Sequence, residues 1–211
     1  MNVTIFGGTG TTGLLVIQKA LSAGHSVTAY ARTLSKISIQ HNNLTVIEGE
    51  LTDIEKIKSS VKNADAVISV LGPTGKSKGL VISKGIKNII SAMQMHGVKR
   101  LIATATPSYK VSKDKFQFGF TLGVFMVKSF INDTYQDIVA TGEEIAKSPL
   151  DWTIVRLPML SNNPSKGKLN IGYTGDGQVN LFSLSRTDLA DFLIQQLADK
   201  TYLRQAPVIS N

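Results

Sequence analysis

The chain has 211 residues, of which 23 are Lys or Arg and 15 are Asp or Glu, so its formal net charge is +8. A hydrophobic share of 42% supports a sizeable core and excludes a disordered chain, and the length allows one domain or at most two small ones. The absence of cysteine excludes disulfides, thiolate metal sites and cysteine nucleophiles, and three scattered histidines offer little for a zinc site.

Short runs rich in Val and Ile alternate with longer segments of helical period. The predicted strands are 2–6, 26–31, 44–48, 66–71, 101–106, 152–156, 168–173 and 179–184, with an edge strand at 207–209. The predicted helices are 11–23, a segment through Val61 that Asp53 caps, 80–96, 133–147 and 186–198. This alternation, with strands that are apolar throughout, predicts a parallel sheet with helices on both faces. We expect one doubly wound α/β domain of Rossmann type over residues 1–211, with a small C-terminal portion on the substrate side.

Neither the N-terminal segment nor the most apolar internal segment suggests a membrane protein. The first ten residues, MNVTIFGGTG, have no basic region and no long apolar stretch, so they do not read as a signal peptide. The most apolar and aromatic run, residues 116–130, is too short for a spanning helix, which needs about 20 apolar residues. We therefore predict a cytoplasmic protein without a membrane span.

Three glycines stand between the first predicted strand and the first predicted helix. Gly7, Gly10 and Gly13 lie in GGTGTTG with the spacing G-x-x-G-x-x-G. One glycine allows a sharp turn, another lets backbone amides approach a pyrophosphate, and the third lets helix and strand pack closely. The helix N-terminus then attracts the phosphates through its unpaired amides and partial positive charge. The motif predicts a dinucleotide site, and the alternative is an ordinary tight turn.

The residue after the second predicted strand indicates which dinucleotide binds. Enzymes that prefer NAD carry Asp or Glu there for the ribose 2′-hydroxyl. This chain has no acidic residue before Glu48, and Arg32 follows the strand SVTAYA, with Lys36 close behind. A guanidinium can hold a 2′-phosphate with paired hydrogen bonds. We predict NADP(H) over NAD(H), and the alternative is that Arg32 is a solvated surface residue.

An ordered series of segments resembles the NmrA-like branch of the atypical short-chain dehydrogenases, especially its flavin reductases of the biliverdin reductase B type. The series runs through TIFGGTGTTG, HSVTAYAR, VIEGELTD, DAVISVLG, GIKNIISAMQMHGVKRLIATAT, LDWTIVRLPML and SLSRTDLADFLIQQL. The glycine turn is common to many families, whereas the helix through HGVKR and the strand WTIVR are specific to this group. The resemblance implies an NAD(P)-binding Rossmann fold and a reductase.

The resemblance also implies roles for residues along the chain. The residues that would hold the pyrophosphate are Gly7, Thr9, Gly10, Thr11, Thr12 and Gly13. Arg32, with Ser35 or Lys36, would hold the 2′-phosphate, and Glu50 and Leu51 would meet the adenine, with Glu50 replacing the usual Asp. The residues that would pass beneath the cofactor or surround its nicotinamide are Leu71, Gly72, Thr104, Ala105, Thr106, Pro158 and Met159.

A strong acid–base set is missing from the sequence. Short-chain dehydrogenases usually carry a Ser, then a Tyr, then a Lys four residues after the Tyr. Tyr109 and Lys113 have this last spacing, but they follow Pro107 in a predicted loop and cannot face each other as they would on a helix. Hydride transfer to a flavin or quinone depends more on the cofactor than on a positioned acid. Thr106 is the candidate catalytic residue, as a hydrogen-bonding partner of such a ring, and its alternative role is to cap the strand end.

Phenylalanines gather in the segment after the fifth predicted strand. Phe116, Phe118, Phe120 and Phe125 are candidates for contact with a flat apolar acceptor at the carboxyl edge of the sheet. Packing in the core or in a dimer interface is the alternative.

These observations favour an NADPH-dependent oxidoreductase that transfers hydride to a flavin or quinone-like small molecule. A non-catalytic NADP(H)-sensing regulator that binds a protein partner is the alternative, because it also needs no acid–base set. A sugar-nucleotide epimerase or dehydratase is disfavoured by the short C-terminal part. The lysines are dispersed without a basic–aromatic motif, so we expect no nucleic-acid partner. We expect the protein to be a monomer or a homodimer.

Overall fold

The computed structural model describes residues 1–73, 79–118 and 132–211. The strands of the main sheet within these residues are β1 (Asn2–Phe6), β2 (Ser26–Ala31), β3 (Leu44–Glu48), β4 (Ala66–Ser69), β5 (Arg100–Ala105), β6 (Asp151–Arg156), β8 (Asn170–Gly172) and β10 (Val208–Ser210). The helices are α1 (Thr11–Ser22), α2 (Ile54–Val61), α3 (Val81–Met95), α5 (Asn132–Lys147) and α6 (Arg186–Gln195), and a short 3-10 turn, η1, spans Leu34–Lys36. A small second sheet pairs β7 (Leu160–Ser161) with β9 (Leu184–Ser185).

The strand order of the main sheet is β3-β2-β1-β4-β5-β6-β10-β8. The first seven strands in this order pair in parallel, and β8 pairs with β10 in the antiparallel direction. The chain leaves β1 toward β2 on one side and later returns to pair β4 with its other side, so the order reverses at β1. Ligands of open α/β sheets bind at the carboxyl ends of the strands beside such a reversal.

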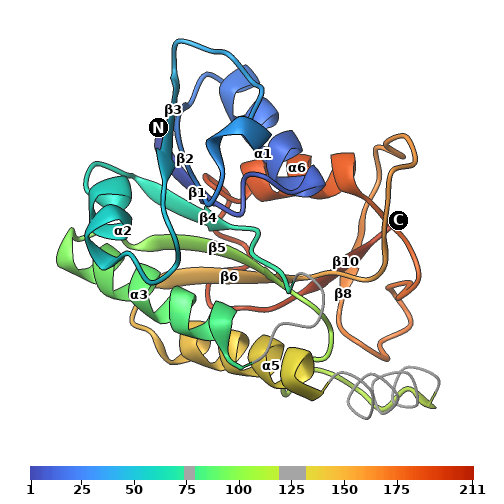
Figure 1. Ribbon diagram of the computed structural model, residues 1–211. Helices are drawn as coiled ribbons and strands as arrows, with labels where there is room; N and C mark the ends of the chain where they lie inside the picture. Colours follow the sequence, from blue (N-terminus) through green and yellow to red (C-terminus); the bar gives the residue numbers. More distant parts are fainter. Residues whose placement is uncertain (74–78, 119–131) are drawn as a thin grey trace.

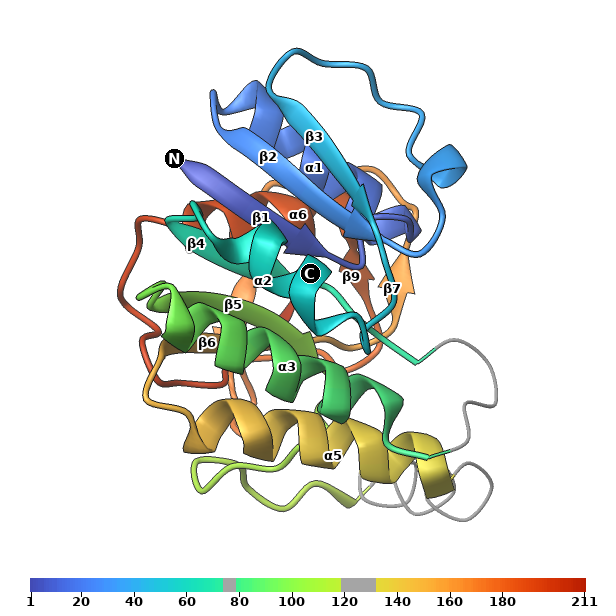
Figure 2. The same ribbon diagram turned by 60° about the vertical axis from the view of Figure 1, so that its left-hand side comes forward.

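Helices cover both faces of the sheet, as the apolar strands predict (Figure 1). One buried cluster joins α1 and α6 to the face that carries Val3, Ile5 and Ile68. A second cluster joins α2, α3 and α5 to the face that carries Phe6, Val67 and Leu101, and Figure 2 shows these three helices side by side. The predicted doubly wound α/β fold is confirmed.

The C-terminal third differs from the prediction in two places. Residues 179–183 do not form a strand, and of the predicted segment only Leu184 does, as the first residue of β9. Asn180 Oδ1 accepts a hydrogen bond from the Phe182 amide at 2.8 Å and holds a local turn that competes with a ladder. The last strand is not an edge strand: β10 lies between β6 and β8, and its Val208 and Ile209 are fully buried. Continuous apolar character marks burial on both faces, which is the property of an interior strand.

One capping prediction is confirmed for the position of the N-cap, Asp53, but not for a side-chain contact. The helix α2 does begin directly after Asp53, but the carboxylate makes no side-chain cap to that helix. It accepts a hydrogen bond from the amide of Glu50 at 2.8 Å and so closes the turn between β3 and α2.

An ion pair between Arg156 and Asp114 lies inside the C-terminal part of the fold. Arg156, on β6, has 0% of its surface exposed and donates to both carboxylate oxygens of Asp114 at 2.6 and 2.8 Å. The carboxylate also accepts from the amides of Val111 and Thr174. The pair therefore joins the loop after β5 to β6 and to the segment after β8.

Within the described residues, no helix combines the length and the apolar character needed to cross a membrane.

Candidate functional site

The glycine turn joins β1 to α1 beside the end of β4. Gly7 has a φ of +87°, and a Cβ atom there would lie 2.8 Å from the carbonyl carbon of Val70, so no other residue fits. A Cβ atom on Gly13 would overlap the carbonyl oxygen of Gly7, which shows how closely α1 packs on the turn. These are the steric reasons for which the spacing predicts glycine at both positions.

The N-terminus of α1 opens at this turn without a competing carboxylate. Gly10 is the N-cap, with extended backbone angles and no side-chain cap, and the first turn contains Thr11 and Thr12 but no acidic residue. The N-terminal amides of a helix have no intrahelical partners and carry partial positive charge. An anion of the right size can therefore bind here.

A cleft of about 470 Å³ runs from the glycine turn along the carboxyl ends of β1, β2, β3 and β4. The predicted site residues that line it are Gly7, Thr9, Gly10, Arg32, Lys36, Glu50, Leu51, Leu71 and Gly72. The structure thus brings the glycine turn together with the ends of β2, β3 and β4, whereas Thr11, Thr12 and Gly13 do not line the cleft. The volume of the cleft lies in the usual range of small-molecule pockets.

Arg32 and Lys36 form a positively charged corner of this cleft. Both side chains are exposed, and within the described residues neither forms a hydrogen bond or an ion pair with another part of the chain. Lys36 ends the turn η1, whereas Ser35 in the same turn does not line the cleft. Two unpaired cations at the end of β2 are suited to a phosphate.

The segment Gly49 to Leu51 forms another part of the wall, beside the end of β2, and is held from two sides. The hydroxyl of Tyr30 donates to the carbonyl of Glu50 at 2.8 Å, and Asn88 Nδ2 donates to the carbonyl of Leu51 at 2.9 Å. Burial, together with the charges of Asp53 and Glu50, raises the pKa of Tyr30 to about 12, so the phenol stays protonated and keeps donating.

A smaller pocket of about 100 Å³ continues the cleft toward β5 and α5. It shares Leu71, Gly72, Pro73 and Ile82 with the large cleft. The other residues that line it are Thr104, Ala105, Thr106, Ile138, Thr141 and Leu157. Thr106 Oγ1 accepts a hydrogen bond from the amide of Ser108 at 3.3 Å, so the capping role is present while the residue also lines the pocket.

Several predicted site residues lie away from these two pockets. Pro158 and Met159 follow β6, but Leu157 rather than either of them reaches the small pocket, and the Met159 side chain is 71% exposed. Phe116 and Phe118 are also largely exposed and line neither pocket. Phe120 and Phe125 lie outside the described residues. Contact of these residues with a ligand stays a prediction.

The Tyr109–Lys113 spacing does not produce a dyad. The ring of Tyr109 is buried against Gly142 of α5, and burial is the main cause of its raised pKa. Lys113 Nζ instead donates to the Tyr173 hydroxyl at 3.3 Å and to Gln205 Oε1 at 2.9 Å. The two side chains serve different parts of the fold.

Sequence reasoning missed the cleft residues that helices supply. These residues are Val81, Ile82, Lys84, Gly85 and Asn88 on α3 and Ile138 and Thr141 on α5. Gly85 and Asn88 stand in the segment GIKNIISAMQMHGVKRLIATAT, but no role in the site was predicted for them, because the place of all these residues depends on how α3 and α5 pack on the sheet. Tyr30 was also missed, although its position two residues before Arg32 on the same strand end was a usable signal.

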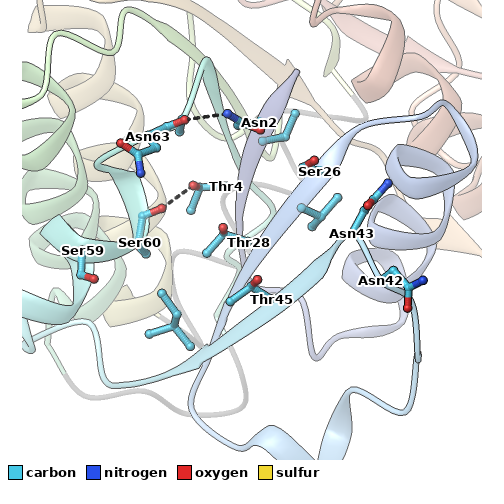
Figure 3. A pocket seen from close by; sticks show the side chains of 14 residues that line it. Asn2, Thr4, Ser26, Thr28, Asn42, Asn43, Thr45, Ser59, Ser60 and Asn63 are labelled. Carbon is cyan, nitrogen blue, oxygen red and sulfur yellow. Dashed lines mark hydrogen bonds between the residues drawn. The ribbon is translucent and has the colours of Figure 1, made fainter.

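Another pocket lies at the opposite, amino-terminal ends of β1, β2 and β3 (Figure 3). Its lining is uncharged, and its buried hydroxyls already have partners: Thr4 donates to the Ser60 carbonyl at 2.6 Å and Ser60 to the Ile57 carbonyl at 2.7 Å. Asn2 Nδ2 likewise donates to the carbonyl of Asn63. This pocket presents no charged group and no unpaired buried donor to a ligand.

The sequence model of a family described as NAD(P)H-binding matches residues 7–200. The chain belongs to this NAD(P)H-binding family. The match includes the glycine turn and both pockets of the cleft, and it confirms the family type that the residues suggested.

Two curated relatives are similar to this chain over part of their own length. A 2-alkyl-3-oxoalkanoate reductase of Stenotrophomonas maltophilia is 25% identical over 216 residues, which cover 92% of this chain and 64% of the relative. The photosystem II assembly factor Ycf39 of Synechocystis is 30% identical over 107 residues, 48% of this chain and 32% of the relative. The chain spans less than two thirds of the length of either protein.

Solved structures of low sequence identity share the fold of this member of the NAD(P)H-binding family. The oxidoreductase ylbE from Lactococcus lactis has a TM-score of 0.82 at 23% identity, over 100% of this chain and 91% of its own. A short-chain dehydrogenase/reductase of Veillonella parvula in complex with NADP has a TM-score of 0.81 at 22% identity, over 100% and 94%. ChuY, an anaerobillin reductase from Escherichia coli, has a TM-score of 0.78 at 17% identity, over 100% and 97%.

Proposed function

We propose that this member of the NAD(P)H-binding family is an NADPH-dependent oxidoreductase that delivers hydride to a flavin or quinone-like small molecule. The observation that carries the proposal is the unpaired pair of cations, Arg32 and Lys36, at the end of β2 in the cleft that starts at the glycine turn. A carboxylate at this strand end would repel a 2′-phosphate, and the chain has none before Glu48.

The large cleft would hold the adenosine half of the cofactor. Thr9, Gly10, Thr11 and Thr12 would offer amides and hydroxyls to the pyrophosphate at the N-terminus of α1, where no acidic side chain competes. Arg32 and Lys36 would bind the 2′-phosphate, with Ser35 close by on η1. The wall from Gly49 to Leu51, fixed by Tyr30 and Asn88, would lie against the adenine.

The small pocket would hold the nicotinamide end, where the cofactor supplies the hydride. Leu71 and Gly72 would lie beneath it, while Thr104, Ala105 and Thr106 would border it at the end of β5. We further propose that Pro158 and Met159 contact the nicotinamide end and that the acceptor is contacted by Phe116, Phe118, Phe120 and Phe125.

The chemistry of the small pocket favours an acceptor that needs no positioned acid. None of the residues that line it has a side chain that titrates near neutral pH. A flavin or quinone can take its proton from solvent after hydride transfer, whereas a simple ketone usually needs a donor at its oxygen. The relatives named as reductases support reduction as the reaction, although the oxoalkanoate named for one of them is a ketone.

The proposal has the protein working in the cytoplasm, as a monomer or homodimer. Its partner would be a small molecule rather than nucleic acid, because the lysines are dispersed and no basic–aromatic motif accompanies them.

Steady-state oxidation of NADPH and NADH with riboflavin, FMN and menadione tests the function. We expect turnover with at least one acceptor and a kcat/KM for NADPH about tenfold or more above that for NADH, since the 2′-phosphate gains charged hydrogen bonds. Equal or better use of NADH would refute the assignment of Arg32. Tight NADPH binding without turnover on any acceptor would favour the alternative, a redox-sensing regulator that binds a protein partner.

A further inference from the structure

Five buried side-chain oxygen atoms lack a hydrogen-bond partner within the described residues. They belong to Thr134, Thr141, Ser161, Thr174 and Gln196. Of these residues, only Thr141 also lines one of the two pockets of the cleft. A buried hydroxyl without a partner is costly to a fold, so an unpaired one at a pocket wall points to a bound ligand.

Thr141 lies on α5, and only 6% of the residue is exposed. Around it the wall of the small pocket is apolar, with Ile138 one turn earlier on the same helix and Leu157 at the end of β6. In such surroundings water cannot easily serve the hydroxyl, and a hydrogen bond to a ligand gains strength from the low local dielectric.

No charged side chain contributes to the lining of the small pocket in the described part of the chain. A carboxylate or phosphate buried there would have no cation to pair with, and burying an unpaired charge is strongly unfavourable. A neutral carbonyl oxygen needs only a donor. Thr106 can serve as a second one, because its oxygen accepts from the Ser108 amide and its own hydrogen stays free to donate.

We propose that Thr141 is a ligand-binding residue whose hydroxyl donates a hydrogen bond to a carbonyl oxygen on an uncharged part of the ligand in the small pocket. The identity of the ligand rests on the proposed function: the carbonyl belongs either to the nicotinamide amide of the cofactor or to the acceptor. The substrate class that follows is an uncharged, carbonyl-bearing ring such as a flavin or quinone. An acceptor that must bury a carboxylate at this position is excluded.

The test is Thr141→Val, which removes the hydroxyl and keeps the branched shape. Equilibrium titrations give the dissociation constants of NADPH, riboflavin and menadione for the variant and the unmodified protein. The thermal unfolding midpoint, Tm, is measured for both proteins as well. We expect the dissociation constant of NADPH or of the acceptors to rise about three- to tenfold, the usual effect of one neutral hydrogen bond. We also expect Tm to stay the same or rise, because the hydroxyl has no partner in the protein alone. Thr141→Ser restores the donor and should restore binding.

Thr134→Val is the matched control, since Thr134 is on the same helix and equally lacks a partner but lines neither pocket. Its dissociation constants should equal those of the unmodified protein. Loss confined to NADPH assigns the carbonyl to the cofactor, and loss confined to riboflavin or menadione assigns it to the acceptor. Unchanged constants for all three ligands, or equal losses in both variants, overturn the proposal. Because these are binding constants, this outcome is independent of whether the protein turns over.

Discussion

Arg32 is the exposed side chain on which the proposed preference for NADP(H) rests. It stands at the carboxyl end of β2, lines the large cleft and has no partner within the described residues. A surface arginine that is already paired must give up that ion pair when it binds a ligand, so it contributes little to the binding free energy. An unpaired arginine has no such pair to break when it binds a phosphate.

We expect Arg32→Ala to raise the dissociation constant of NADPH about ten- to a hundredfold, which corresponds to the loss of one or two charged hydrogen bonds. The constant of NADH should change less than about twofold, because NADH has no 2′-phosphate. Fluorescence titration with each nucleotide measures both values. Lys62→Ala removes an exposed cation outside the cleft and serves as the control. Equal losses for the two nucleotides would contradict the assignment.

At this scale the sequence predicted residues whose requirement is local. Gly7 needs a positive φ and Gly13 needs an absent side chain, and both demands follow from one turn between one strand and one helix. Thr141 and Asn88 reach the cleft from helices that are distant in sequence, so no spacing could indicate them.

At the scale of elements, the N-terminus of α3 depends on a side chain of α5. Asp137 is fully buried and accepts hydrogen bonds from the amides of Ile82 and Ser83, each at 2.8 Å. Its carboxylate thus caps α3 from outside the helix, at the end where partial positive charge gathers. Since Ile82 lines both pockets, this cap also sets the position of a cleft wall.

Asp137→Asn should lower the free energy of unfolding by about 1–3 kcal/mol, because an amide NH₂ would face a backbone donor in a buried place. NADPH should bind more weakly as the start of α3 shifts. Urea unfolding and a nucleotide titration measure the two effects. Glu144→Gln, on the same helix and without a described contact of its side chain, should leave both values unchanged. Unaltered stability in Asp137→Asn would show that the cap is unimportant.

The elements themselves were predicted well where hydrophobic period and strand type agree. β1, β2 and β3 have the predicted bounds, because apolar runs between turn residues leave little choice. The strand predicted over residues 179–184 was wrong for residues 179–183, because Asn180 forms a local turn there. The last strand, β10, was predicted at the edge of the sheet but lies between β6 and β8. Apolar character predicts that a strand is buried, but not between which strands.

At the scale of the whole molecule, Asp114 and Arg156 connect segments that lie 42 positions apart in the sequence. Burial by itself raises the pKa of Asp114, but hydrogen bonds from Arg156, Val111 and Thr174 and the guanidinium charge outweigh it. The net pKa of Asp114 therefore lies below its ordinary value of 3.8.

A carboxyl group whose pKa is lower in the folded than in the unfolded state stabilises the protein at pH values above its unfolded pKa. This stabilisation is lost as the pH falls through the folded pKa. Asp114→Asn should cost about 3 kcal/mol near neutral pH, since it leaves the buried guanidinium of Arg156 without a countercharge. The difference from the unmodified protein should shrink as pH falls from 3.8 through the lower folded pKa, because residue 114 is then neutral in both proteins. Urea unfolding across this range checks it, with the exposed Glu48→Gln as control. A difference that is constant with pH would contradict the assignment.

The sequence by itself determined the class of fold, the dinucleotide turn and the cation at the end of β2, because each depends on neighbours within a few positions or on a simple period. The tertiary structure decided what faces the ligand at the other end of the cleft. Packing of α3 and α5 on the sheet brings Ile82 and Thr141 beside the end of β5. It also makes β10 an interior strand and pairs the buried guanidinium of Arg156 with Asp114. These contacts depend on how helices and strands that are distant in sequence pack together, and no local sequence pattern indicates that packing.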